Sequence, residues 1–191
     1  TTFEKRFVDL GDERDRAEFL KLWPIGKFPV LRDDARQRTV PESTTIIEYL
    51  ATHYPGPVKL VPDDPDLARA TRFSDRFFDF HVHLHMQKIV GDRIRPAGNK
   101  DPHGVEDARR RLLAALGMVD RDMATKTWAM GDAFTLADCA AAPALFYVDK
   151  VQPLADGHPN VAAYLKRLMA RPSYARALKE AEPYFKFFPQ E

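Results

Sequence analysis

The sequence predicts a two-part protein, with a mixed α/β segment over residues 1–56 and an all-helical domain over residues 65–191. Three observations carry this prediction. Short apolar runs alternate with a helical pattern in the first part, and prolines punctuate a linker at 57–64. Beyond the linker, apolar residues recur at helical spacing over long stretches. A chain of 191 residues is long enough to bury a core without disulfides or metals.

The charges nearly balance, because 29 Lys and Arg oppose 28 Asp and Glu for a net charge of +1. This balance gives no electrostatic argument for a nucleic-acid partner or an anionic membrane. No apolar run approaches the roughly 20 residues that a membrane-spanning helix needs. A single cysteine excludes an internal disulfide and a multi-cysteine zinc site. We therefore expect a protein of the reducing cytoplasm.

Turn residues divide the α/β segment into short elements. Gly11-Asp12 ends the first apolar run, Pro24 and Gly26 stop a helical pattern, and Asp33-Asp34 forms a turn. The expected elements are a strand at 3–10, a helix at 13–23, a short run at 28–31, a strand at 37–40 and a helix at 43–53.

The remaining chain has the pattern of a helical bundle. Asp64-Pro65 and Asp101-Pro102 each combine a cap residue with a proline suited to the first helical position. Apolar residues follow both signals in steps of three and four, which predicts two long adjacent amphipathic helices. Three further helices are expected at 135–148, 159–170 and 173–181.

Pro29 interrupts the run Lys27-Phe28-Pro29-Val30-Leu31. A proline cannot donate to a strand ladder, so an edge strand with a trans proline is the favoured interpretation of this segment alone. A cis bond before Pro29 is the alternative, and it would leave the preceding amide free for a ligand's backbone.

Glu42 and Ser43 stand directly before the apolar helix at 43–53. A serine hydroxyl and amide at a helix N-terminus suit a carboxylate, and a neighbouring glutamate suits an ammonium group. Together they would recognise the α-carbon end of an amino acid. An ordinary N-cap is the alternative, with Thr45 and Glu48 as a competing capping box, and on these residues alone it is favoured.

Thr135 and Asp138 form the pattern of a capping box, and Phe134 precedes them as a hydrophobic staple. This pattern predicts the start of a buried helix, and no catalytic role is assigned to it.

The segments 24–31 (PIGKFPVL) and 42–50 (ESTTIIEYL) together resemble the second half of a glutathione transferase N-terminal domain. The segments 131–138 (GDAFTLAD), 158–161 (HPNV) and 171–174 (RPSY) resemble the C-terminal domain of the same cytosolic, bacterial-type family. The resemblance implies a thioredoxin-like domain followed by an all-helical one. It also implies a homodimeric detoxification enzyme that conjugates or reduces small hydrophobic electrophiles.

Glutathione is the cosubstrate that this resemblance implies, without a metal. Its main chain would bind the amide of Phe28 beside a cis Pro29, its γ-glutamyl end would bind Glu42 and Ser43, and Lys27 would contribute. The same fold kept as a non-catalytic binding or interaction module is the alternative function.

The family's first strand and first helix precede the part that resembles residues 1–10. They carry the Tyr, Ser or Cys that polarises the glutathione sulfur, and no such residue is identified in this chain. We therefore expect that the chain lacks roughly 20 or more N-terminal residues, enough for one strand and one helix.

His81, His83 and His85 would share one face of a strand, but the surrounding pattern is helical, and there only His81 and His85 share a face. Two imidazoles are too few ligands for a zinc site. His81 and His85 are therefore expected to line a pocket for the second substrate, with plain solvated histidines as the alternative and a metal site as a third, less favoured interpretation. Cys139 is expected to be a buried small apolar residue. The aromatic tail at 184–188 is expected to pack back near the domain boundary.

Overall fold

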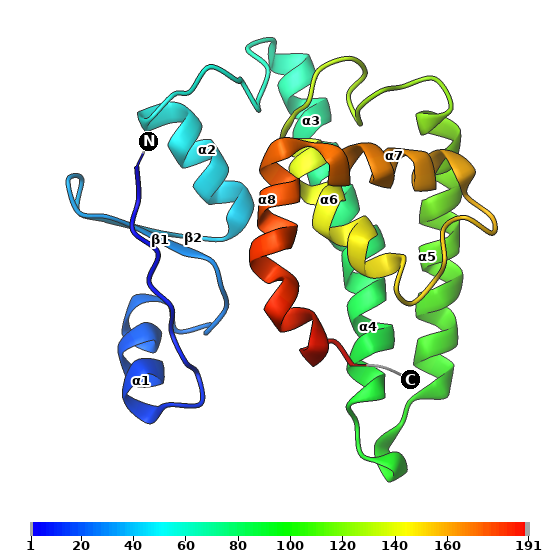
Figure 1. The fold of residues 1–191 in the computed structure, drawn as a ribbon, viewed down its shortest axis with the longest axis horizontal. Helices are drawn as coiled ribbons and strands as arrows, with labels where there is room; N and C mark the ends of the chain where they lie inside the picture. Colours follow the sequence, from blue (N-terminus) through cyan, green and yellow to red (C-terminus); the bar gives the residue numbers. More distant parts are fainter. Residues whose placement is uncertain (1, 190–191) are drawn as a thin grey trace. The chain divides into compact units, whose positions relative to one another are not determined.

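A computed structural model describes residues 2–189 of the chain, which divides into two compact units between Val61 and Pro62. Figure 1 traces the elements from α1 to the C-terminal turn. The first unit contains α1 (Glu13–Leu22), β1 (Val30–Asp33), β2 (Arg38–Pro41) and α2 (Ser43–His53). The second contains α3 (Pro65–Phe77), the π-helix η1 (Phe78–His83), α4 (Leu84–Arg93), the 3₁₀ turn η2 (Ala97–Asn99), α5 (Pro102–Met123), α6 (Leu136–Val148), α7 (Pro159–Ala170), α8 (Pro172–Ala181) and the 3₁₀ turn η3 (Glu182–Phe187). These units bear out an α/β part followed by an all-helical part.

The strand expected at residues 3–10 is wrong. Residues 3–9 form no strand, and the side chains of Phe3 and Phe7 are 72% and 78% exposed. A strand needs a neighbour to pair its backbone groups. In the described range β1 and β2 are the only named strands, and they pair with each other.

Local signals start the long helices of the second unit. Asp64 accepts hydrogen bonds from the amides of Asp66 and Leu67 at 3.0 and 2.8 Å, and Asp101 accepts one from Gly104 at 2.9 Å. Each cap satisfies amides that have no partner inside the helix. The helix that begins at Pro65 is not a regular α-helix throughout. In its η1 segment the Leu84 amide donates to the Asp79 carbonyl, five residues earlier, as in a π-helix.

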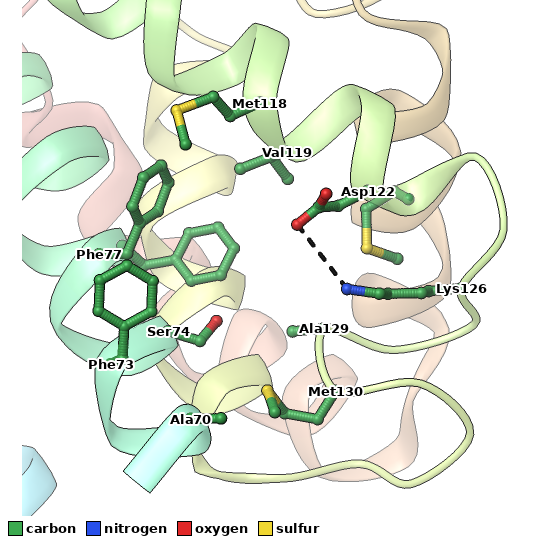
Figure 2. A pocket seen from close by; sticks show the side chains of 12 residues that line it. Ala70, Phe73, Ser74, Phe77, Met118, Val119, Asp122, Lys126, Ala129 and Met130 are labelled. Carbon is green, nitrogen blue, oxygen red and sulfur yellow. Dashed lines mark ion pairs between the residues drawn. The ribbon is translucent and has the colours of Figure 1, made fainter. Parts of the chain in front are cut away.

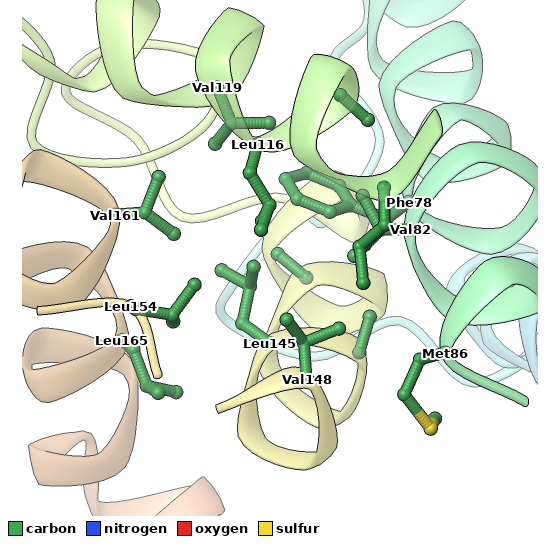
Figure 3. Close-up of a cluster of buried hydrophobic side chains, with 14 of the residues drawn as sticks. Phe78, Val82, Met86, Leu116, Val119, Leu145, Val148, Leu154, Val161 and Leu165 are labelled. Atoms are coloured by element: carbon green, nitrogen blue, oxygen red, sulfur yellow. The ribbon is translucent and has the colours of Figure 1, made fainter. Parts of the chain in front are cut away.

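The helical unit packs around one apolar core (Figure 3). Phe78 and Val82 of η1, Leu116 of α5, Leu145 of α6 and Val161 of α7 are at most 2% exposed. α5 and α7 each bury one apolar stripe against the others, whereas α6 is apolar on all sides and buried over most of its surface. No helix of the described residues is both long and apolar enough to span a bilayer.

A buried carboxylate holds the hairpin and α2 of the first unit together. Asp33, at the end of β1, is 7% exposed. Its Oδ2 accepts hydrogen bonds from the hydroxyls of Tyr49 at 2.6 Å and Tyr54 at 2.8 Å. The hydrogen bond from Tyr49 is the main cause that holds the pKa of Asp33 below its usual value. This network ties the hairpin to α2 and its C-cap.

Asp33→Asn is expected to lower stability at neutral pH and to weaken its pH dependence in acid. The lowered folded-state pKa means that Asp33 contributes stability above its unfolded pKa of about 3.9. That contribution is lost as the pH falls through the folded-state value. Urea midpoints at pH 7 and pH 3 measure the effect, with exposed Asp34→Asn as the control. Parallel pH profiles in wild type and Asp33→Asn would contradict the prediction.

Candidate functional site

The hairpin register brings together two segments that lie thirteen residues apart in the sequence. β1 and β2 pair antiparallel, with Val30 opposite Pro41. Continuing this register by one residue sets Pro29 beside Glu42. The Lys27–Pro29 segment therefore approaches the start of α2, where Ser43 is the first helical residue.

Phe28 is held in place by an aromatic contact with α1. Its ring stacks on the ring of Phe19, with centroids 4.6 Å apart. Phe19 is 6% exposed, whereas Phe28 is 54% exposed. The Phe28–Pro29 peptide bond is cis, so the trans bond favoured for this segment alone is wrong and the cis bond implied by the resemblance is found. Lys27 and Pro29 are exposed on either side of Phe28.

The start of α2 has an unusual backbone. Glu42 is the N-cap residue at φ 67° and ψ 127°, and its side chain makes no capping hydrogen bond. A positive φ is uncommon for a residue with a side chain, and such strain concentrates at functional sites. Ser43 follows as the first helical residue, so it is not the N-cap. Thr45 lies inside α2, so it cannot cap the helix with Glu48.

A hollow between α4, α6 and the C-terminal tail forms a second feature, which we call the aromatic pocket. Its volume is about 600 Å³. Its lining residues are His83, Met86, Gln87, Val90, Gly91, Tyr147, Tyr184, Phe185, Phe187, Phe188 and Pro189. Such an apolar, mainly aromatic lining with one imidazole is typical of sites for small hydrophobic molecules.

The tail is fixed to the helices that it covers. The ring of Phe188 stacks on Tyr147 at 5.4 Å, and the ring of Phe185 lies 5.3 Å from Phe146. The guanidinium of Arg93 donates a 3.0 Å hydrogen bond to the Pro189 carbonyl. The tail therefore packs on α4 and α6.

His81 and His85 do not line the aromatic pocket, and His83 does. His81 is exposed, with its ring 5.2 Å from that of Phe77. His85 is half-buried, and burial followed by the Arg111 guanidinium lowers its pKa. The helical spacing of His83, Gln87 and Gly91 was the signal that sequence reasoning missed.

Cys139 is half-buried rather than fully buried. Burial raises the pKa of its thiol to about 11. A thiolate is the reactive form of cysteine, so this residue is unsuited to act as a nucleophile at neutral pH. Across residues 2–189 no cluster of three or more His, Cys, Asp or Glu side chains could hold a metal ion.

Two family models match the chain. Residues 3–58 match the glutathione S-transferase N-terminal domain, and residues 77–172 match the glutathione S-transferase C-terminal domain. The second match alone covers half of the chain. The chain belongs to the glutathione S-transferase family.

Similar proteins agree with this membership. Glutathione S-transferase GstB of Escherichia coli K12 is 28% identical over 163 residues, which cover 85% of this chain and 78% of GstB. A glutathione S-transferase of Methylobacillus flagellatus, solved with glutathione bound, is 26% identical with a TM-score of 0.80 over 90% of this chain and 84% of its own. A Methylobacterium radiotolerans glutathione S-transferase in complex with glutathione sulfonate is 31% identical, with a TM-score of 0.71 over 82% of this chain and 74% of its own.

The family matches include the first candidate feature completely and the aromatic pocket in part. The five residues Lys27, Phe28, Pro29, Glu42 and Ser43 all lie in the glutathione S-transferase N-terminal match. The C-terminal match contains His83 and Tyr147 but ends before the tail at 184–189. Most of the aromatic side chains of the pocket therefore come from a segment outside the matched region.

Proposed function

We propose that this glutathione S-transferase binds glutathione at the site formed by Lys27–Pro29 and Glu42–Ser43. The glutathione sulfur then attacks small hydrophobic electrophiles, which are either conjugated through a new C–S bond or reduced by two glutathione molecules that leave as their disulfide. The observation that carries the proposal is the antiparallel register of Val30 with Pro41, which joins the two segments. The family's solved members with bound glutathione support the choice of ligand.

Glutathione carries one ammonium group and two carboxylates, and this site has a complementary group for each. The Ser43 hydroxyl and amide, at the positive end of α2, suit the γ-glutamyl carboxylate. The Glu42 carboxylate suits the neighbouring ammonium group. Lys27 is exposed and suits the carboxylate at the opposite, glycyl end.

The amide of Phe28 donates a hydrogen bond to the main chain of the tripeptide. The stacking of Phe28 on Phe19 holds this part of the backbone, so little ordering is left to occur on binding. The cysteinyl unit of glutathione lies between its two ends, so a backbone contact at Phe28 orients the thiol as well.

These residues bind the main chain and the ends of glutathione, and none of them is assigned to its sulfur. A free thiol has a pKa of about 8.5 and is mostly protonated at neutral pH. The nucleophile is the thiolate. When it attacks an electrophilic carbon, a C–S bond forms, the leaving group departs with its electron pair, and the thiol proton is released.

The aromatic pocket is the proposed site for the electrophile. Its rings favour planar aromatic molecules, through offset stacking and edge-to-face contacts. His83 is an imidazole in this lining and can form a hydrogen bond to a polar substituent such as a nitro or carbonyl group. His83 thereby takes the role that the sequence assigned to His81 and His85.

His83→Ala is expected to shift the preference between a nitroaromatic and an alkyl electrophile about two- to tenfold toward the alkyl compound, because one hydrogen bond is lost. The measurement is kcat/KM for both electrophiles on the full chain. The glutathione Kd should not change. The matched control is the double variant His81→Ala, His85→Ala, and a larger shift in that variant would restore the assignment made from the sequence.

The proposed assembly is a homodimer in the cytoplasm, acting in detoxification. Resemblance to the family supports the dimer, and the single cysteine supports a reducing compartment. Sedimentation equilibrium tests the assembly directly.

Conjugation tests the function as a whole. The protein is expected to bind glutathione at one site per chain, and to accelerate its reaction with an aryl halide in a form that carries the sulfur-polarising residue expected from the resemblance. Binding without acceleration, under conditions in which the protein is folded, would favour the non-catalytic module. Failure to bind glutathione would contradict the proposal outright.

A further inference from the structure

The tail at 184–189 supplies most of the aromatic rings that line the aromatic pocket. Figure 1 shows the chain beyond α8 returning to α4. The hollow in Figure 2, between α3, η1 and the C-terminal half of α5, includes no residue of this tail. The position of the tail therefore decides the shape of the aromatic pocket and does not bear on that hollow.

Four aromatic rings join the tail to α6. The ring of Phe185 lies 5.3 Å from that of Phe146, and the ring of Phe188 lies 5.4 Å from that of Tyr147. Phe146 and Tyr147 are themselves in contact, with centroids 5.2 Å apart. All three separations are within the roughly 4.5–7 Å of favourable aromatic pairs. Phe146 lies outside the pocket lining, so it affects the pocket by holding Phe185.

One ammonium contacts both rings of the Phe146–Phe185 pair. Lys150 follows the C-cap residue of α6, and its Nζ lies 4.7 Å from the ring centroid of Phe146 and 5.6 Å from that of Phe185. Both distances are within the roughly 6 Å over which a cation is attracted to an aromatic face. Within residues 2–189 this ammonium forms no ion pair. Its partners are therefore one ring of α6 and one ring of the tail.

Lys186 offers a contrast, because it carries the same charge without the same connection. Its ammonium lies 5.1 Å from the ring centroid of Phe187, the next residue of the tail. That ring is 71% exposed. The contact stays within the tail, so it cannot hold the tail against α6.

On the basis of the electrophile site proposed above, we propose that Lys150 is a positioning residue of the aromatic pocket. Its ammonium holds Phe185 against Phe146 and so keeps this part of the pocket wall in place. Lys150 does not line the pocket itself and acts through Phe185. The attraction depends on the positive charge, so arginine can replace lysine here, whereas the uncharged methionine cannot.

Calorimetric titration of the full chain with 1,3-dinitrobenzene tests this role. The compound has no leaving group, so it binds without reacting and needs no glutathione. Lys150→Met should weaken its binding about two- to fivefold, and Lys150→Arg should restore it. Lys186→Met is the matched control and should leave the affinity unchanged. Gln87→Trp, which fills the aromatic pocket from an exposed position, should abolish binding.

Limited digestion of the full chain with chymotrypsin measures the position of the tail without a ligand. Cleavage after Tyr184 and Phe185, followed by mass spectrometry, requires the tail to leave α6. This cleavage should be about two- to fivefold faster in Lys150→Met than in wild type, and close to wild type in Lys150→Arg. Bound 1,3-dinitrobenzene should slow it. Urea midpoints of all variants control for a general loss of stability.

The outcomes separate this role from the electrophile site. Binding to wild type that Lys150→Met leaves unchanged would overturn the role of Lys150 and leave the site standing. Equal weakening in Lys150→Met and Lys186→Met would overturn it as well, because the effect would then follow from net charge. Failure of Lys150→Arg to restore affinity would exclude the charge as the cause. No binding to wild type would contradict the electrophile site, and the role of Lys150 with it.

Discussion

Asp138→Ala is expected to destabilise the helical unit by about 3–5 kcal/mol, which is at the upper end of what single substitutions cost. Asp138 is 0% exposed. Its Oδ1 accepts hydrogen bonds from the Tyr164 hydroxyl at 2.6 Å and the Ala129 amide at 2.8 Å, and its Oδ2 accepts from the Thr135 amide at 2.8 Å. Removing the carboxylate leaves two buried donors, the Tyr164 hydroxyl and the Thr135 amide, and the half-buried Ala129 amide without this acceptor, and each buried donor costs about 1–3 kcal/mol, not fully additively.

The Asp138 network joins three parts of the helical unit: the loop before α6, the capping box of α6, and α7. Tyr164 is itself fully buried, and burial, with the neighbouring Asp138 carboxylate, raises the pKa of its hydroxyl. The hydroxyl therefore stays protonated, and so remains a donor, at neutral pH. Loss of Asp138 disconnects all three parts at once, whereas Tyr164→Phe removes only one hydrogen bond and should cost about 1 kcal/mol.

Urea denaturation of Asp138→Ala, Tyr164→Phe and the double variant measures these costs and the coupling between the two residues. Asp132→Ala, an exposed aspartate in the same loop, is the control and should change stability little. A loss below about 1 kcal/mol in Asp138→Ala would mean that water satisfies the three donors instead.

Elements that begin with a local signal could be predicted from the sequence. The bounds of α2, Ser43–His53, agree with the expected helix, and the caps at Asp64, Asp101 and Thr135 form as expected. In each case the residues that decide the structure lie within about one turn of each other. Such signals depend little on the rest of the fold.

Features that depend on distant partners could not be predicted. Asp120 of α5 caps α7 by accepting hydrogen bonds from the amides of Asn160 and Val161, some forty residues away. The burial of Asp33 depends on Tyr49 and Tyr54 in the same way. Only tertiary packing brings such groups together, and no periodicity encodes it.

For the same reason, one part of the candidate site could be predicted from the sequence and the other, the aromatic pocket, could not. The five residues that we propose bind glutathione came from two short motifs, and one hairpin register unites those motifs. The aromatic pocket required the tail at 184–189 to return to α4, about one hundred residues earlier in the chain. The helical spacing of His83, Gln87 and Gly91 places them on one face, but only the return of the tail makes that face the lining of a pocket.

Ser43→Ala is expected to weaken glutathione binding by about 1–3 kcal/mol, because a hydrogen bond to a charged carboxylate is lost. This corresponds to about five- to 150-fold in Kd. Ser43 is exposed at the first position of α2, and the cap residue before it contributes no side-chain hydrogen bond to the helix. The substitution should therefore change affinity without a matching change in stability.

Calorimetric titration of glutathione into wild type, Ser43→Ala and Thr45→Ala separates the two roles that Ser43 could have. Thr45 is an exposed hydroxyl residue two positions later in the same helix, so it controls for any general effect on α2. The partner residue is tested with N-acetylglutathione, in which the ammonium group is replaced by a neutral amide. Glu42→Gln should weaken binding of glutathione but not of this analogue, because only glutathione offers a charge to Glu42. Unchanged glutathione affinity in a folded Ser43→Ala variant would reduce Ser43 to an ordinary helix residue, and equal losses for both ligands in Glu42→Gln would remove Glu42 from the recognition of the ammonium group.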